Sequence, residues 1–448
     1  MQTEVVVTLI AYLLLVFGLS IYAYGHRQSG NFLNEYFLGN RSMGSFMLAM
    51  IQLPAAWLSL GVLGKKFAIL ARCYNAITLN DMLYGRFQSR MLVWLASLSL
   101  LVAFLGAMTV QFIGGARLLE SAVGIPYNIG LLIFGISIML YTAFGGFRAG
   151  VLNDAMQGLV MLLGTVLLLG AVINAADGLH HAVDKLQQID PALVSHQGGD
   201  QILSLQFMAS FWVLVCFGVI GLPHTAVRCI SYKDSKAVHC GIILSTVVVA
   251  LLMLGMHLAG ALGRAVLPDL KIPDQVIPML MVTVLPPYAA GIFLAAPLAA
   301  IMSTINAQLL QSSATIVKDL YLGVRPQHID SARMIKRLYN LTTLILGLLV
   351  LLAAWHPPEI IICLNLLAFG GLEAVFLWPL VLGLYWRANA QGVLSSMLSG
   401  AICSLLASFG LQPAGLHPIL HALLLSLLGF YIGNVVGEKL RVASYLAS

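Results

Sequence analysis

The sequence predicts an all-α polytopic membrane protein, on three observations. Hydrophobic residues make up 60% of the 448 residues, and charged residues make up only 9%. A soluble protein would carry about 25% charged residues to solvate its surface. Apolar runs of the length that crosses a bilayer, about 20 residues, recur along the whole chain. Much of the molecular surface must therefore face lipid.

About twelve apolar runs qualify as spans within a single transmembrane domain over residues 1–448. They are Val5–Tyr24, Met43–Leu63, Met91–Phe112, Ile129–Phe144, Ala155–Ala175, Phe207–Leu222, Gly241–Leu262, Tyr288–Val317, Leu338–Trp355, Ile360–Leu384, Gly392–Leu411 and Ile419–Val436. Each run is too apolar and too long for an ordinary surface helix of a soluble protein.

The charges of the loops predict which side of the membrane each loop occupies. Cytoplasmic loops carry an excess of Lys and Arg, which describes the basic segments Lys65–Arg90 and Lys318–Arg337. The segment Asp177–Asp200 is acidic and is expected outside. The net charge of +6 then reflects loop lysines and arginines facing the cytoplasm, and we expect no nucleic acid as a partner.

The run Met43–Leu63 conflicts with this pattern, because both of its flanks are basic. Arg27 and Arg41 precede it, and the Lys65–Arg90 segment follows it. Two explanations remain open. The chain could start in the cytoplasm and place Arg27 and Arg41 outside, beside Glu35. Alternatively, one span and its loop are missing between Met50 and Ile51.

A comparison of the two halves of the chain favours the missing span. Many secondary transporters contain inverted repeats, with ligands bound where discontinuous helices cross the membrane midplane. A repeat that begins at Phe207 contains five spans up to Leu384, whereas a repeat over 43–175 contains only four. The shortfall lies at the position that the charges also indicate.

Four stretches identify a known family. They are "FLNEYFLGNRSMG" (32–44), "YTAFGGFRAGVLNDAMQG" (141–158), "LAAIMSTINAQLLQSSATIVKDLY" (298–321) and "FGGLEAVFLWPLVLGLYW" (369–386). They resemble the solute:sodium symporter family over nearly the whole chain. The resemblance implies a leucine-transporter-like inverted five-plus-five repeat core with an external N-terminus, one leading span and two trailing spans.

Within that frame, residues 43–175 form an incomplete first repeat, 207–384 the second repeat and 392–436 the two trailing spans. The family carries a Ser/Thr/Gly-rich helix and a loop between stretches that resemble "SMGSFMLAM" and "IQLPAAWLSL", which are fused here at Met50–Ile51. In the family that helix is the broken first core helix. It lines the substrate site and supplies half of the sodium ligands.

The resemblance also implies the function. We expect sodium-coupled symport of pantothenate, a small organic anion, across the bacterial cytoplasmic membrane, with Na+ as coupling ion and no other cofactor. Two alternatives are a symporter of another small anion or of an amino acid such as proline, and a variant that does not transport because its core is truncated. An enzyme is not expected, since the histidines include no His-Glu-x-x-His pattern.

The expected sodium ligands lie in "AAPLAAIMSTINAQ". Ala300, Ser303 and Thr304 fall within about one helical turn and offer a carbonyl and two hydroxyls. Ser and Thr in membrane helices also bond to their own helix without binding anything, but the resemblance implies sodium ligands at these positions. Asp154, at the start of a span, is either a helix N-terminal charge or, by resemblance, a point on the sodium path to the cytoplasm.

Candidate substrate contacts come from spans that line the cavity in the family. Pantothenate carries a carboxylate, an amide and two hydroxyls, so its site needs hydrogen-bonding groups in an apolar cavity. The resemblance implies Gln111, Trp212, Phe217 and Asn365 as candidates, although Gln111 could bridge helices and Trp212 could belong to an interfacial belt. Arg228 matches a family arginine that we interpret as structural.

Overall fold

The computed structural model describes residues 3–25, 60–195, 204–270, 275–325, 332–357, 361–408 and 417–446. Its first half contains α1 (Thr3–Gly25), η2 (Leu60–Gly64), α5 (Lys65–Cys73), α6 (Leu79–Phe87), α7 (Arg90–Val123), α8 (Tyr127–Ala175), α9 (Leu179–Ile189) and η3 (Pro191–Val194). Its second half contains α10 (Leu205–Trp212), η5 (Val213–Phe217), η6 (Gly218–Gly221), α11 (Pro223–Arg228), α12 (Ser235–Val266), α13 (Val276–Val284), α14 (Pro287–Ala314), η8 (Thr315–Leu322), α15 (Ala332–Ala353), α16 (Ile361–Tyr385), α17 (Ala390–Ser408) and α18 (Pro418–Leu446).

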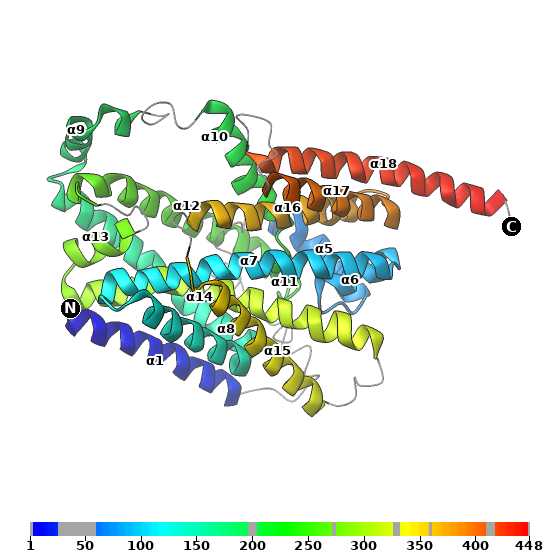
Figure 1. Ribbon diagram of the computed structural model, residues 1–448, viewed down its shortest axis with the longest axis horizontal. Coiled ribbons are helices and arrows are strands. Elements are labelled where there is room, and N and C mark those ends of the chain that lie inside the picture. Colours follow the sequence, from blue (N-terminus) through cyan, green and yellow to red (C-terminus); the bar gives the residue numbers. More distant parts are fainter. Residues whose placement is uncertain are drawn as a thin grey trace.

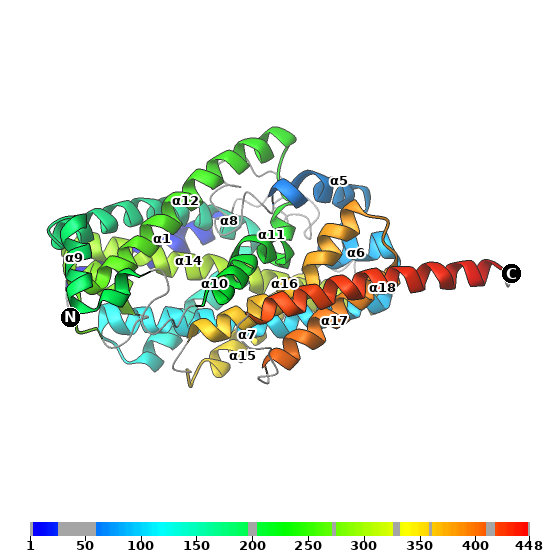
Figure 2. The same cartoon turned by 90° about the horizontal axis from the view of Figure 1, so that it is seen from above.

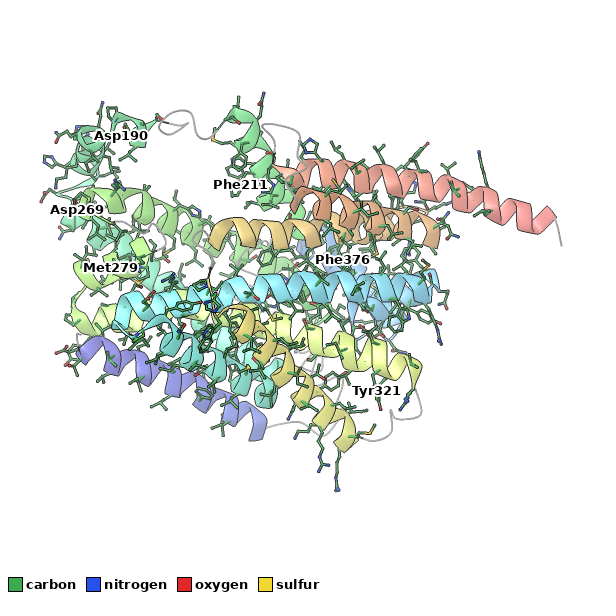
Figure 3. All side chains as sticks on the ribbon, viewed as in Figure 1. Asp190, Phe211, Asp269, Met279, Tyr321 and Phe376 are labelled. Atoms are coloured by element: carbon green, nitrogen blue, oxygen red, sulfur yellow. The ribbon has the colours of Figure 1, made fainter. Side chains whose placement is uncertain are left out.

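The long helices run roughly along one common direction and form a bundle (Figure 1). α9 and α13 lie at one end of the bundle, and α5 and α6 lie towards the other end. α18 extends beyond its neighbours in both views (Figures 1 and 2). Side chains fill the spaces between helices and also project outward along the length of the bundle (Figure 3).

The expected spans are borne out wherever the structure describes them. Within the described residues, eight helices are long and apolar enough to cross a membrane. The shorter apolar helices Thr3–Leu19, Tyr127–Ala143 and Leu205–Gly221 correspond to three further expected spans. The remaining run, Met43–Leu63, lies almost entirely outside the described residues, as do Arg27, Arg41 and the Met50–Ile51 junction.

One difference from the expected layout concerns α8, which continues from Tyr127 to Ala175 across two expected spans. A straight helix of 49 residues would be about 74 Å long, more than twice the thickness of the bilayer core. The apolar windows Tyr127–Ala143 and Gly150–Ala175 are each suited to one crossing. We therefore count α8 as two spans joined by helical backbone.

The direction of α1 indicates on which side of the membrane the chain starts, which the two basic flanks of Met43–Leu63 left open. α1 begins at the end of the bundle where α9 lies and runs towards the end where α5 and α6 lie (Figures 1 and 2). Its Gly25 end therefore points towards the side of the basic Lys65–Arg90 segment. This direction agrees with an external start of the chain rather than a cytoplasmic one.

α1 shows how the sequence pattern positions a helix at the core. Val5, Leu9, Tyr12 and Val16 recur at helical spacing and are buried. They face α8 and α14, the two helices that carry the expected sodium residues. The opposite face, which includes Leu14, is exposed and suited to lipid. The leading helix is thus packed directly against the centre of the molecule.

Candidate functional site

A discontinuous helix begins the second half of the chain. Ser204 caps α10 by accepting a hydrogen bond from the Phe207 amide over 3.1 Å. The helix then widens into the π-helical η5, tightens into the 3₁₀ helix η6 and opens at Leu222, whose backbone is extended. Pro223 starts α11, where its missing N–H costs no hydrogen bond. Such breaks create ligand sites in transporters.

The three expected sodium residues lie together on α14. The Ser303 and Thr304 hydroxyls both donate to the Ala300 carbonyl, each over 3.0 Å. Both hydroxyl oxygens keep lone pairs that could face a cation. The same arrangement occurs on α12, where Ser245 and Thr246 both donate to the Ile242 carbonyl. Bonding to the helix's own backbone is therefore not by itself a mark of a binding site.

The environment of the α14 residues distinguishes them from the α12 pair. Ala300, Ser303 and Thr304 line a cavity of about 400 Å³ between α8, α11, α12, α13 and α14, whereas Ser245 and Thr246 do not. Asp154 lines the same cavity from α8. The remaining wall is largely apolar and rich in methionine: Met161, Met253, Met256 and Met281. The structure thus brings all four expected ion residues to one cavity.

Asp154 forms a buried ion pair that the sequence did not reveal. The Arg228 guanidinium donates to one carboxylate oxygen of Asp154 over 3.1 Å, and the two side chains are 9% and 4% exposed. Arg228 lies at the end of α11, so the pair connects the discontinuous helix to α8. A buried ion pair is sensitive to removal of either partner, since the remaining charge is then uncompensated.

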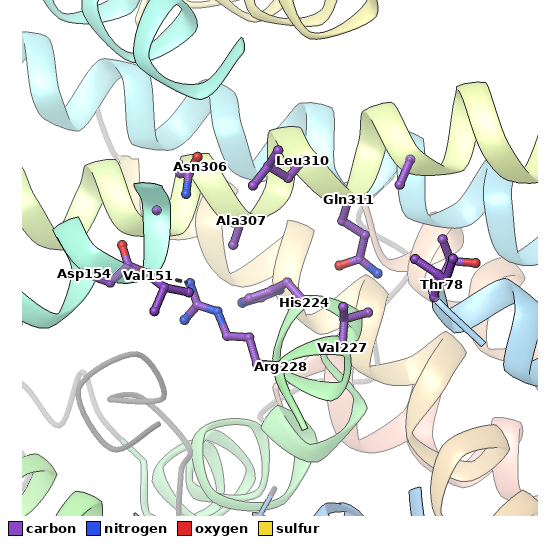
Figure 4. Close-up of a pocket in the computed structure, with 13 residues that line it drawn as sticks. Thr78, Val151, Asp154, His224, Val227, Arg228, Asn306, Ala307, Leu310 and Gln311 are labelled. Atoms are coloured by element: carbon purple, nitrogen blue, oxygen red, sulfur yellow. Dashed lines mark hydrogen bonds and ion pairs between the residues drawn. The ribbon is translucent and has the colours of Figure 1, made fainter. Parts of the chain in front are cut away.

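A smaller cavity of about 40 Å³ lies next to this pair, between α8, α11 and α14 (Figure 4). Several buried polar atoms at its wall have no hydrogen-bond partner among the described residues: Asp154 Oδ1, His224 Nδ1, Asn306 Oδ1 and both amide atoms of Gln311. Buried polar groups are normally satisfied by protein, ordered water or an ion. This volume is suited to one water molecule or a small ion.

His224 is held in place by aromatic side chains. Its ring lies 5.8 Å from the Phe104 ring and 6.1 Å from the Phe369 ring, measured between centroids. These contacts fix the histidine between α7 and α16 at the edge of the small cavity. His224 and Gln311 were not predicted from the sequence. The signal that could have found Gln311 is a polar residue inside an apolar run. His224 lies just beyond the run Phe207–Leu222, so that signal does not mark it.

A polar network joins α6 to η8 beyond the small cavity. Asp319 accepts hydrogen bonds from the Thr78 hydroxyl and the Asn80 amide, each over 2.8 Å. Lys318 forms an ion pair with Asp81, and Asp81 completes a capping box with Thr78 at the start of α6. The network connects α6 to η8, which directly continues α14, the helix that carries Ala300, Ser303 and Thr304.

The expected substrate residues are not brought together at the two cavities. Gln111 is half-buried on α7, whereas Trp212 and Phe217 are 66% and 57% exposed at the ends of α10 and η5. Asn365 lies in α16, and its side chain is outside the described residues. Gln111, Trp212 and Phe217, whose side chains are described, do not line either cavity. The role of all four residues in substrate binding stays a prediction.

Comparisons with known proteins give consistent results. A family model described as Sodium:solute symporter family matches residues 36–400. The "Sodium/pantothenate symporter" of Escherichia coli (strain K12) is 67% identical over 481 residues, which cover 100% of both chains. The protein of the same name from Haemophilus influenzae is 52% identical over 472 residues, 98% of both chains.

More distant proteins share the architecture. The "Sodium/proline symporter" of Staphylococcus aureus (strain Newman) is 29% identical over 98% of this chain and 93% of its own. The solved structure of a Na+-coupled sialic acid symporter in a substrate-bound outward-open state matches with a TM-score of 0.75 at 17% identity, over 98% of both chains. That likeness bears out the expected leucine-transporter-like fold.

Proposed function

Because this chain belongs to the sodium:solute symporter family, we propose that it is built to carry pantothenate together with Na+ across the cytoplasmic membrane. The observation that carries the proposal is the full-length 67% identity to a sodium/pantothenate symporter. The large cavity supports it, because about 400 Å³ falls in the usual range for sites of small organic ligands, about 300–1,000 Å³.

The wall of the cavity combines oxygen ligands for Na+ with an apolar surface for an organic anion, and symport requires both. Oxygen atoms of Ala300, Ser303 and Thr304 on one wall are hard, uncharged ligands of the type that coordinate Na+ in transporters. The methionine side chains elsewhere on the wall are adaptable and apolar, and suit the carbon skeleton of a ligand. Ion and substrate would then occupy neighbouring positions, as coupling of their affinities requires.

We also propose that the ion site of this chain is incomplete. The alignment with the E. coli relative has 481 positions while this chain has 448 residues, so at least 33 positions hold a residue of the relative alone. That number suffices for one span of about 20 residues and a connecting loop. A helix absent between Met50 and Ile51 would remove the oxygens that face Ser303 and Thr304. Transport by the chain as it stands should then be slow or absent.

A different substrate in the same site is the second candidate. Proline symporters align over nearly the whole chain, but their identity of 29% is far below the 67% of the pantothenate relative. The identity therefore favours pantothenate over an amino acid.

Competition in a repaired chain tests the choice of substrate. A helix and loop of the family type are inserted after Met50, and sodium-driven uptake of labelled pantothenate is measured in vesicles. Excess unlabelled pantothenate should abolish uptake of label, and excess proline should leave it unchanged. Inhibition by proline, or uptake of labelled proline in place of pantothenate, would contradict the assignment.

A further inference from the structure

A second acidic side chain lies inside the membrane-spanning part, far along the chain from the ion residues. Glu373 lies on α16, within the span Ala368–Tyr385, and is only 2% exposed. Its Oε2 atom has no hydrogen-bond partner in the described part of the chain. The described residues also form no ion pair with it. An intramembrane carboxyl in this situation needs a physical explanation.

The Glu373 carboxyl is pressed against the discontinuous helix. A Cβ atom added to Gly218 would overlap Glu373 Oε2, and one added to Gly221 would lie 2.8 Å from the Leu377 backbone nitrogen. The two glycines are three residues apart on η6, and their partners are four residues apart on one face of α16. The backbone of the break is thus packed directly on the α16 face that carries the carboxyl.

The described side chains on the helices around α16 supply no compensating positive charge to Glu373. The elements packed against it are α7, η2, η6, α17 and α18, and η2 and η6 contain no titratable side chain. The titratable side chains described on the others are Arg90, Arg117, Glu120, Cys403, His421, Tyr431, Glu438 and Lys439. In the described part of the chain none of them forms an ion pair with Glu373, and neither does His224, which contacts α16 through Phe369.

An isolated carboxylate inside a membrane-spanning segment is unfavourable, because its charge is removed from water. A cation beside it could offset this cost, but the described residues provide none, and the carboxyl does not line either cavity. A proton needs no cavity. We propose that Glu373 is a proton-binding site that holds its proton while η6 packs against α16.

Movement of the discontinuous helix could release the proton from Glu373. When η6 moves away from α16, water reaches the carboxyl, which ionises by passing its proton to water, and closure takes a proton back. In transporters of this architecture one repeat rocks or gates against the other around a site formed by discontinuous helices. Protonation of Glu373 would therefore favour the state in which η6 packs against α16, and ionisation would favour the state in which η6 has moved away. This proposal does not depend on whether the chain transports pantothenate.

Infrared spectroscopy of the purified full chain tests the proposal without any transport. At neutral pH a protonated carboxyl gives a carbonyl stretching band that shifts in D₂O. We expect this band in the unmodified protein and its loss in Glu373→Gln, whose amide matches the protonated acid in shape. Asp177→Asn is the control, because it removes an exposed carboxyl paired with Lys185 at the surface, and it should leave the band in place. A missing band, or one that survives in Glu373→Gln, overturns the proposal.

A second variant tests the same proposal in case Glu373→Gln does not fold. Gly218→Ala places a methyl group where the carboxyl lies, so the band should shift in frequency or weaken. Gly170→Ala, in open space on α8, should leave the band unchanged. An identical band in the Gly218→Ala and unmodified proteins would place the proton on another carboxyl and overturn the assignment to Glu373.

Discussion

Arg228 at the end of α11 donates to Asp154 on α8 over 3.1 Å, across 74 positions of sequence. This contact ties the discontinuous helix to α8, which forms one wall of the ion cavity. The second carboxylate oxygen of Asp154 faces the small cavity without a described partner. Asp154 is therefore held by one cation and has an oxygen available for another.

Replacing Asp154 by Asn should destabilise the protein strongly. Arg228 would remain buried without its counter-charge, and breaking a buried pair in this way costs about 3–5 kcal/mol. Thermal unfolding in detergent measures the effect. The control is Asp177→Asn, which breaks the Lys185–Asp177 pair at the same 3.1 Å but at the surface. That pair should contribute about 0–1 kcal/mol. Equal losses in the two variants would show that the Asp154–Arg228 pair has no special role.

Replacing both Ser303 and Thr304 by Ala should abolish any stabilisation by sodium. A ligand at a hundred times its dissociation constant stabilises the folded state by about 2.7 kcal/mol, and this gain disappears with the ligand oxygens. Unfolding is followed in NaCl and in choline chloride at equal ionic strength.

The α12 pair offers a closely matched control for that experiment. Ser245 and Thr246 make the same two bonds to one carbonyl but lie outside the cavity. The Ser245→Ala/Thr246→Ala variant should keep its full response to sodium. A sodium response that persists in the α14 double variant would exclude this site.

Labelling of single cysteines should place the Lys65–Arg90 segment and the C-terminus in the cytoplasm and the Asp177–Asp200 segment outside. Because α1 ends at Gly25 towards the α5 and α6 end of the bundle, we expect positions beside Arg27 to share the side of Lys65. A membrane-impermeant thiol reagent is applied to intact cells and to inverted vesicles, with the native cysteines replaced. Labelling of Arg27-side positions from outside the cell would contradict this topology.

The spans could be predicted from the sequence because the length and hydrophobicity of each apolar run by themselves indicate that it lies in lipid. The runs that became α7, α12 and α14 need no tertiary information to be recognised. The cluster of Ala300, Ser303 and Thr304 could also be found, since it lies within one helical turn. Its connection to Asp154 came from the family resemblance, and the structure places these residues around one cavity.

The remaining features depend on contacts between distant segments. Arg228 was interpreted as a structural residue at a helix end, and no local pattern pairs it with Asp154. The network of Asp319 with Thr78 and Asn80 spans about half of the chain. The helical continuity of α8 through its middle was missed because the two apolar runs suggested a turn between them.

Sodium-driven uptake of labelled pantothenate into vesicles tests the central claim most directly. The claim is that this chain has the architecture of a sodium/pantothenate symporter but an incomplete ion site. Initial rates are compared between the unmodified chain and the chain with a family-type helix and loop inserted after Met50, at equal protein per vesicle. The repaired chain should transport roughly tenfold faster or more, because loss of ion–substrate coupling acts on that scale, and its uptake should require a sodium gradient. Robust sodium-driven uptake by the unmodified chain would contradict the claim.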